Sequence, residues 1–379
     1  MRREEVFTLI VGLLGIFSGL GLARFAYTVI LEPMREGLMV NYTEMGVIAS
    51  ANFFGYVLFS PFAGYLASKH GSKKIVVSSL LLITITLFLT SFSTSFIDAG
   101  IFRFLTGIGS AGVNVGIVGL AAKWFEIEKR GLALGIINTG SSVGIIFAGF
   151  ALPAVILAYD WRAGWQFLAV ISFIVFLLSL WLRETPERFT PESKIPIAGV
   201  YRERRLVFLG ASYVFFGSSY IIFVTFFTSH LINRGIDYTT SSFLWSMLGF
   251  LSIAGSVLWG RTSDRIGRKT ALQIVYTLMG FAFITFAFTQ SIFTASLATF
   301  MTGLSMLSIP PLVQAYCGDI AGKESASAAI GFVTLFFGIG QMFGPAFGGY
   351  LADVTGGFLL PLISAGIMSL SGALLMRKT

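Results

Sequence analysis

Long stretches without a charged residue recur along the chain and limit what it can fold into. A helix needs about 20 apolar residues to cross the hydrocarbon core of a bilayer, and most of the sequence lies in runs of about that length or longer. The runs are 6–23, 45–68, 75–97, 104–122, 131–159, 163–182, 206–233, 238–260, 270–318, 325–352 and 354–376. The run 270–318 is long enough for two helices with a turn near Gln290 and Ser291. The sequence therefore predicts an all-α membrane protein with twelve transmembrane helices.

The charged residues support this prediction and suggest an orientation. Only 12% of residues are charged, against about 25% in an average soluble domain. If the N-terminus lies inside the cell, 21 of the 26 Lys and Arg residues fall on the cytoplasmic side, as short loops require. We expect a multi-pass protein of the cell membrane with both termini cytoplasmic and no cleaved signal. The net charge of +8 then indicates contact with anionic membrane lipid rather than with nucleic acid.

A basic, glycine-containing segment occurs twice, each time at the end of an apolar run. The copies are GYLASKHGSKK at 64–74 and GRTSDRIGRK at 260–269. Their first glycines are 260 minus 64, or 196, positions apart, which is about half of the 379 residues. Duplicated halves are typical of transporters. We predict two six-helix bundles, residues 1–190 and 206–379, joined by a cytoplasmic linker at 191–205.

Both segments resemble the signature loop of the major facilitator superfamily, Gly-x-x-x-Asp-(Arg/Lys)-x-Gly-(Arg/Lys)-(Arg/Lys). Residues 260–269 match it fully, whereas the first copy has Ser68 at the acidic position. A second family motif, Arg-x-x-x-Gly-x-Gly, is matched by Arg103, Gly107 and Gly109. The resemblance covers essentially the whole chain. It implies a secondary transporter that works by alternating access, with helices 1, 4, 7 and 10 around a central cavity, and family precedent favours a monomer.

The resemblance also implies gating elements. The acidic residue of the loop is expected near the positive N-terminus of a facing helix when the cytoplasmic side is closed. Asp264 can make this contact, whereas Ser68 carries no charge. We therefore expect the contact that closes the cytoplasmic side, here called the latch, to be stronger in the second half. The alternative is that the basic loop residues serve topology alone. The gating candidates are Gly64, Ser68, Gly71, Lys73, Gly260, Asp264, Arg265, Gly267, Arg268, Gly344 and Pro345.

Gly344 and Pro345 belong to the segment GQMFGPAFGG at 340–349. It is similar to the glycine-proline pattern that drug/proton antiporters carry on helix 5, although helix 5 of this chain lacks that pattern. Small residues at four-residue spacing let helices approach closely in lipid, and proline permits bending. Packing alone and packing with motion both remain open for these residues.

Two basic residues lie inside predicted helices, Arg24 in helix 1 and Arg103 in helix 4. An ionised side chain is costly in the bilayer and normally faces a cavity. At the repeat distance of 196 residues, the counterpart of Arg24 in the second half is Tyr220. We therefore expect positive charge on only one side of the predicted site. Arg presents a planar fork that suits a carboxylate. The substrate-binding candidates are Arg24, Tyr27, Arg103, Asn114, Tyr220, Gln314, Tyr316 and Gln341.

Each candidate has a structural alternative. Arg24 can contact substrate, or pair with Glu32 or a neighbouring helix, and Arg103 can be structural or proton-linked. Glu32 and Asp98 come nearest to being buried acids and are the candidates for proton coupling. Asp98 also suits the first turn of a helix because of the helix dipole, and a uniporter or exchanger stays open.

The sequence favours a transporter of a small organic anion, a carboxylate. It contains no paired-carboxylate site, metal cluster or phosphate-binding loop of the nucleotide-hydrolysing kind, so we expect no enzyme, cofactor or metal. The alternative is proton-coupled efflux of lipophilic or cationic drugs, suggested by the helix-4 motif and the 39 Phe residues. A receptor or scaffold built on a transporter fold is a minor alternative.

Overall fold

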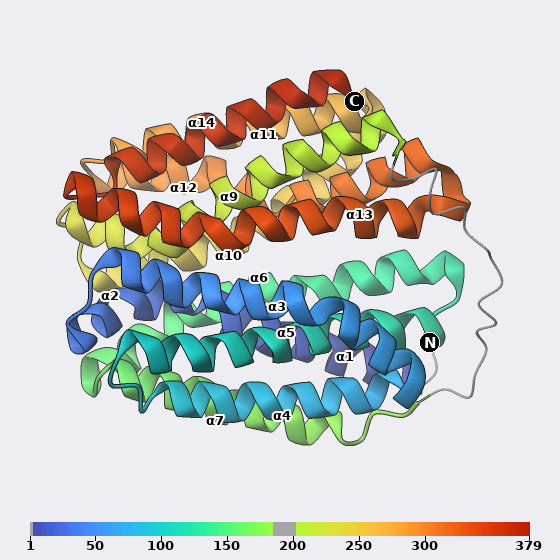
Figure 1. The fold of residues 1–379 in the computed structure, drawn as a ribbon, viewed down its shortest axis with the longest axis horizontal. Helices are drawn as coiled ribbons and strands as arrows, with labels where there is room; N and C mark the ends of the chain where they lie inside the picture. The colour runs from blue at the N-terminus through green and yellow to red at the C-terminus, as the bar shows by residue number, and fades with distance from the viewer. Residues whose placement is uncertain (1–2, 185–201) are drawn as a thin grey trace. The chain divides into compact units, whose positions relative to one another are not determined.

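The computed structural model describes residues 3–184 and 202–379, and these residues form helices and no strand (Figure 1). The helices before residue 185 are α1 (Arg3–Ile16), η1 (Phe17–Phe25), α2 (Tyr27–Leu38), α3 (Tyr42–His70), α4 (Ser72–Thr90), α5 (Phe96–Trp124), α6 (Ile127–Ala158) and α7 (Trp161–Ser179). Those after residue 201 are α9 (Arg204–Asn233), α10 (Tyr238–Ile266), α11 (Arg268–Ala287), α12 (Ile292–Met306), α13 (Ile309–Thr355), α14 (Leu359–Leu375) and the short η2 (Met376–Lys378).

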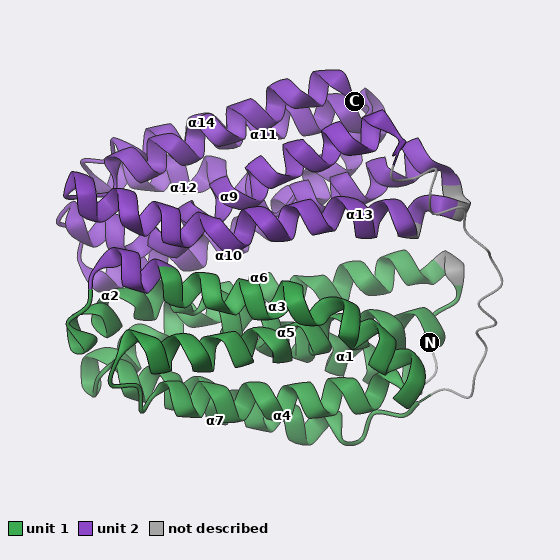
Figure 2. Cartoon of the chain, viewed as in Figure 1, with its two compact units in different colours: residues 1–40, 47–191 green, residues 41–46, 192–379 purple. Residues whose placement is uncertain are grey.

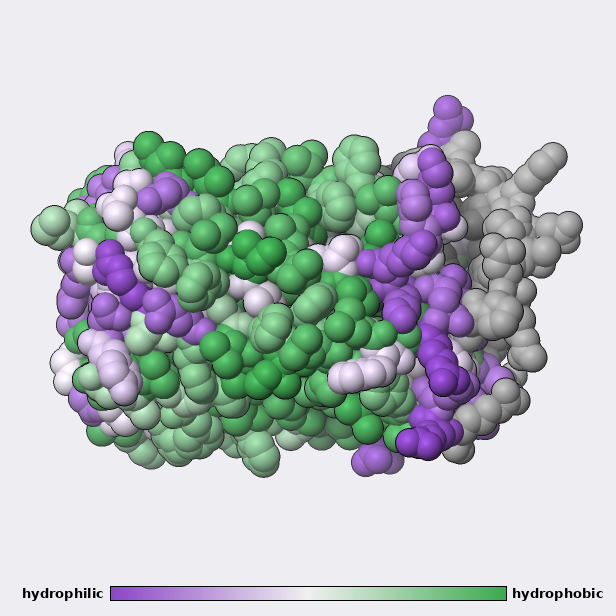
Figure 3. All heavy atoms as spheres, turned by 90° about the horizontal axis from the view of Figure 1, so that it is seen from below, coloured by the Kyte–Doolittle hydropathy of each residue, from purple (hydrophilic) through white to green (hydrophobic). Residues whose placement is uncertain are grey.

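Twelve helical segments of the described residues are long and apolar enough to span a membrane. The prediction of an all-α protein with twelve transmembrane helices is therefore confirmed. The predicted turn near Gln290 is also confirmed, because α12 begins directly after its N-cap, Ser291. In Figure 3, which shows one face of the molecule, hydrophobic side chains cover the middle of the helices and hydrophilic ones gather near their ends.

The first span differs from the run that predicted it. That run ends at residue 23, yet α1, η1 and α2 form one continuous span of 36 residues, Arg3–Leu38, with Arg24 in its interior. The middle of this span, η1, is a π-helix of nine residues. A charge-free run marks where a helix can cross lipid, but a helix covered by neighbouring helices can continue through a basic residue.

The helices form two compact units (Figure 2). Residues 1–40 and 47–191 make unit 1, and residues 41–46 and 192–379 make unit 2. In unit 1, α4 packs on α5 and α7, and η1 packs on α6. In unit 2, α9 packs on α13 and α14, and α11 packs on α14 and α12. The bundle boundaries at 190 and 206 stay a prediction, and most of the linker, 191–201, lies outside the described residues.

The sequence repeat is visible in the local backbone. Gly71 (φ 93°, ψ 144°) and Gly267 (φ 85°, ψ 144°) precede α4 and α11 in nearly the same conformation. Positive φ is accessible to glycine without steric cost. Ser95 and Ser291 each begin a helix with a reciprocal capping box, which satisfies backbone N–H groups at the helix start. Both pairs are 196 positions apart, so the two copies share their turns as well as their sequence.

Candidate functional site

Arg24 lies near the end of η1, in unit 1. The i→i+5 turns of a π-helix are rare in proteins, and those that do occur are often at functional sites. Glycines hold η1 against α6: a Cβ atom on Gly21 would lie 2.7 Å from the Cα of Gly144, and one on Gly140 would lie 2.8 Å from the backbone nitrogen of Phe17. This close packing fixes the backbone that carries Arg24.

The Arg24 side chain is buried, with 8% exposure, and two aromatic rings of α3 enclose it. Its guanidinium carbon is 4.6 Å from the ring centroid of Phe53 and 4.5 Å from that of Tyr56. Its Nε and Nη2 atoms have no hydrogen-bond partner, and the guanidinium makes no ion pair within residues 3–184 and 202–379. Glu32 pairs instead with Arg35, with 2.6 Å between Oε1 and Nη2. The pairing of Arg24 with Glu32 that the sequence left open does not form.

Tyr56 extends this site to α5. The Asn114 side-chain amide donates a hydrogen bond to the Tyr56 hydroxyl at 2.7 Å, and both side chains are half-buried. The ring that contacts the buried guanidinium is therefore hydrogen-bonded through its hydroxyl to a polar side chain of a further helix. Sequence reasoning identified Asn114 and missed Tyr56, although the spacing of Phe53 and Tyr56 by three residues places both on one face of a helix.

Arg103 occupies a different position from Arg24. Its side chain is 1% exposed and lies near the rings of Tyr27 and Trp165, with centroids 5.3 Å and 5.1 Å from the guanidinium carbon. Its Nη1 donates to the carbonyl oxygen of Ala23 at 2.6 Å. Arg103 therefore bonds the turn of η1 that carries Arg24, an arrangement that can support the site without entering it.

The candidates of unit 2 fall into two places. The Gln341 amide donates to the Tyr220 hydroxyl at 2.5 Å, and both side chains are buried between α9 and α13. Tyr316, by contrast, lies 3.3 Å from Arg205 at the start of α9. That position is 15 residues before Tyr220, about 22 Å along a helix. Gln314 is exposed, so the structure joins two of these four residues.

The two acidic candidates both have partners. The carboxylate of Asp98 accepts hydrogen bonds from the backbone N–H groups of Thr94, Ser95 and Ala99 at 2.8 to 2.9 Å. This is the helix-start arrangement that the sequence analysis offered as its structural alternative. Glu32 is held by Arg35, as described above.

Glu184, which the sequence analysis did not identify, bonds the first signature loop. Its carboxylate accepts the backbone N–H groups of Ser72 at 3.0 Å and Lys73 at 2.7 Å, and lies 3.0 Å from the Lys123 ammonium. Burial opposes ionisation, but these hydrogen bonds outweigh it and keep the pKa of Glu184 below its usual range. The Ser68 hydroxyl donates to the Tyr65 carbonyl of its own helix.

The second signature loop is arranged differently. Arg268 bonds Asp319 of α13 at 2.5 Å and lies 3.8 Å from Asp264. Subtracting 196 from Asp319 gives Lys123, so the two copies use opposite charges at this position. Asp264 thus faces the first residue of α11, and its expected role as a latch stays a prediction.

Gly340, Gly344 and Gly348 of the segment 340–349 pack on α9. A Cβ atom on Gly344 would overlap the side chain of Ile221, and one on Gly340 would overlap the carbonyl oxygen of Val214. Pro345 lies inside α13. A packing role is therefore present, and a role in motion stays a prediction.

Three relatives of known or assigned transport function are similar to the chain over most of its length. The hexuronate transporter of Bacillus subtilis is 22% identical, covering 93% of this chain and 89% of its own. The probable sulfoacetate transporter SauU of Cupriavidus necator is 24% identical, covering 93% and 88%. The multi-drug resistance efflux pump PmrA of Streptococcus pneumoniae is 26% identical, covering 82% and 80%.

The fold is also that of a solved transporter. A bacterial homologue of the human lysosomal transporter Spinster, in an inward-facing and occupied conformation, superposes with a TM-score of 0.85 at 15% identity, over 100% of this chain and 97% of that one. Residues 16–377 match the family model described as "Uncharacterised MFS-type transporter YbfB". The chain belongs to this family of the major facilitator superfamily and is a multi-pass membrane transporter rather than an enzyme.

Proposed function

We propose that the chain is a secondary transporter of small organic anions, carboxylates in particular, and that Arg24 binds the anionic group. The observation that carries the proposal is the buried Arg24 guanidinium without an acidic partner in the described residues. A buried charge is expensive unless it is paired and hydrogen-bonded. A substrate carboxylate would satisfy the free donors of Arg24 in the bidentate geometry that a guanidinium prefers.

The neighbouring groups suit the remainder of such a substrate. The Tyr56 hydroxyl and the Asn114 amide can bond hydroxyl groups of a sugar acid, and the rings of Phe53 and Tyr56 exclude water from the ion pair. Hexuronate and sulfoacetate, named in two of the relatives, are both organic anions. We extend the proposal to alternating access by a monomer in the cell membrane, with both termini cytoplasmic. The basic residues favour that orientation.

The proposal does not assign a coupling proton to Glu32 or Asp98. Both carboxylates already have partners in unit 1: Glu32 pairs with Arg35, and Asp98 accepts three backbone N–H groups. We therefore favour a proton carried together with the substrate, or exchange of one anion for another, over a relay through either acid.

Efflux of cationic compounds is the second candidate, and its support is the similarity to the PmrA pump. An unpaired guanidinium repels a cationic substrate, which argues against a cation site at Arg24. Neutral lipophilic compounds escape that objection.

The test is the unfolding temperature of the purified full chain with glucuronate, glucose, sulfoacetate or tetraphenylphosphonium. A ligand at about 100 times its dissociation constant adds roughly 2.7 kcal/mol to stability. Glucuronate and glucose differ by the carboxylate, so we expect the first alone to stabilise. The effect should disappear in Arg24→Gln and persist in part in Arg24→Lys, which keeps the charge. Stabilisation by tetraphenylphosphonium that survives Arg24→Gln, with none by the anions, would overturn the proposal.

A further inference from the structure

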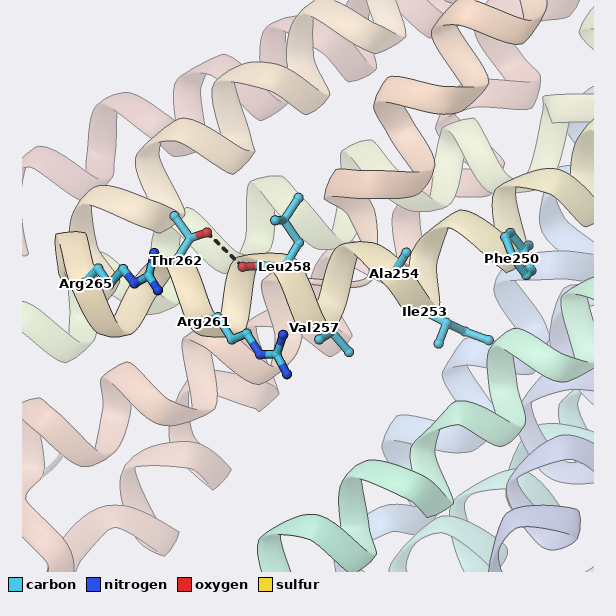
Figure 4. A pocket seen from close by; sticks show the side chains of 8 residues that line it. All are labelled: Phe250, Ile253, Ala254, Val257, Leu258, Arg261, Thr262 and Arg265. Atoms are coloured by element: carbon cyan, nitrogen blue, oxygen red, sulfur yellow. Dashed lines mark hydrogen bonds between the residues drawn. The ribbon is translucent and has the colours of Figure 1, made fainter.

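A hollow of about 600 Å³ lies on one face of α10 in unit 2, far along the sequence from Arg24 (Figure 4). All the residues that line it belong to α10: Phe250, Ile253, Ala254, Val257, Leu258, Arg261, Thr262 and Arg265. Their spacing of three and four residues is that of a single helical face. The hollow therefore follows the axis of one helix, with Phe250 at one end and Arg265 at the other.

The two ends of the hollow differ in polarity. Phe250, Val257 and Leu258 are large apolar side chains that are 67%, 53% and 52% exposed. Arg261 and Arg265 follow within two turns, and both are exposed. The Thr262 hydroxyl between them bonds the Leu258 carbonyl and is satisfied within the helix. The face is thus an apolar strip that ends in two guanidinium groups.

Neither guanidinium has an acidic partner within the described residues. The nearest acidic residue along the chain, Asp264, instead lies 3.8 Å from Arg268, whose other partner is Asp319. Arg268 is therefore neutralised by its neighbours, whereas Arg261 and Arg265 together present a charge of +2. An exposed basic residue in a last helical turn is ordinary, but two on the same face beside an apolar hollow are a more specific arrangement.

The other half of the chain lacks this pair. Subtracting 196 from Arg261 and Arg265 gives Tyr65 and Lys69 on α3. The corresponding face of α3 is also apolar, with Phe54 and Phe62 exposed. The apolar strip is thus common to both halves, and the paired guanidiniums belong to one.

We propose that this hollow binds one anionic phospholipid, with its phosphate between Arg261 and Arg265 and an acyl chain along Phe250 to Leu258. A guanidinium suits a phosphate because its donors match two oxygens. Eleven residues separate Phe250 from Arg261, about 16 Å of helix, which accommodates much of an acyl chain. A soluble anion would leave the apolar strip unused, whereas a phospholipid matches both ends. The proposal does not depend on the substrate of the transporter.

Native mass spectrometry of the detergent-purified full chain can test this by titration with dioleoyl phosphatidylglycerol or dioleoyl phosphatidylcholine. We expect the tightest phosphatidylglycerol site to weaken by about tenfold or more in the double variant Arg261→Gln/Arg265→Gln, because each basic residue near the membrane surface adds to the attraction of anionic lipid. Phosphatidylcholine binding should not change. Inorganic phosphate at the same concentration should not compete, because it lacks the acyl chain.

Two further variants separate a site from general electrostatics. Lys269→Gln/Arg377→Gln removes the same charge outside the hollow and should leave the tightest site intact. Ala254→Trp fills the hollow and keeps both arginines, and it should weaken the site as well. Equal weakening by the two double variants, or no effect of either hollow variant on correctly folded protein, would overturn the proposal. Folding is checked by the unfolding temperature without lipid.

Discussion

The Tyr56 ring lies against the guanidinium of Arg24, with 4.5 Å between the ring centroid and the guanidinium carbon. The same phenol accepts a hydrogen bond from Asn114 on α5. One aromatic residue of α3 thus connects the buried charge of η1 to a polar group of a third helix. The contact explains how a basic residue is tolerated in the middle of a membrane span, since a cation over a desolvated ring is stabilised by about 2 kcal/mol.

Removing the Tyr56 hydroxyl should weaken substrate binding. Tyr56→Phe keeps the ring against Arg24 and leaves the Asn114 amide without its acceptor, so we expect a two- to tenfold loss of affinity for the stabilising carboxylate, since one hydrogen bond contributes about 0.5–1.5 kcal/mol. Tyr56→Ala should cost more. Titration of the ligand against unfolding temperature measures both. Tyr65→Phe, on the exposed face of the same helix, is the control, and equal effects at the two positions would contradict this role.

The two buried arginines should differ in their effect on stability. Arg103→Ala removes a charge-assisted hydrogen bond to Ala23 and leaves a cavity, so we expect a loss of about 2–4 kcal/mol in the free energy of unfolding. Arg24→Ala loses its contacts with two rings but also removes a buried charge without an acidic partner, whose burial is expensive, so the two effects offset and the net cost should be small. Urea or thermal unfolding in one detergent compares them. A loss for Arg24→Ala as large as for Arg103→Ala would show that Arg24 is structural.

Helix packing against η1 should be sensitive to a single methyl group. Gly140→Ala places a Cβ atom onto the Leu13 carbonyl at the end of α1 and 2.8 Å from the backbone nitrogen of Phe17 in η1, and overpacking of this kind costs about 1–3 kcal/mol. Gly135→Ala, on the same helix with nothing within 4 Å of the new atom, should be neutral or stabilise by up to about 1 kcal/mol. Unfolding temperatures of the two variants decide this, and a tolerated Gly140→Ala would argue against tight packing of η1 on α6.

Acidification should remove the contribution of Glu184. Its pKa is lower in the folded chain than in the unfolded chain, where a glutamate has a pKa of about 4.3. The stabilisation is therefore complete above that pH and is lost as the pH falls through the folded value. The difference in unfolding temperature between wild type and Glu184→Gln should be largest near pH 7 and shrink below about pH 4.

The control for this prediction is Glu126→Gln, which removes an exposed carboxylate whose partner is Lys129. Its difference from wild type should be small across the same range. A Glu184→Gln difference that stays the same as the pH falls from 7 to well below 4 would contradict the assignment.

The helices were predictable because membrane crossing requires a certain length and an apolar composition, and both can be recognised from the residues of each helix alone. The turn at Ser291 follows from the same requirement. The two basic residues inside spans were also recognisable, since Arg24 and Arg103 interrupt apolar sequence. Their different environments were not, because these depend on which side chains of other helices meet them.

The missed residues share that cause. Tyr56 is one of 12 tyrosines, and nothing next to it in the sequence indicates that it meets Arg24. Glu184 contacts Lys73 from 111 positions away, beyond the reach of any local pattern. Tyr316 was chosen because its helix was expected to line a cavity, whereas the structure places its hydroxyl beside Arg205 and Thr379.

Because η1 is a π-helix, the two halves of the chain match in sequence position here but differ in local helix geometry. Residues 213–221, the counterparts of η1 in the second half, wind as part of the α-helix α9. One residue of helix turns a side chain by about 100°, so a segment with wider turns rotates everything that follows it relative to an α-helical copy. Arg24 and Tyr220 therefore hold equivalent positions in the sequence repeat but lie on helical segments of different winding, so equal position in the repeat does not imply equal direction from the helix axis.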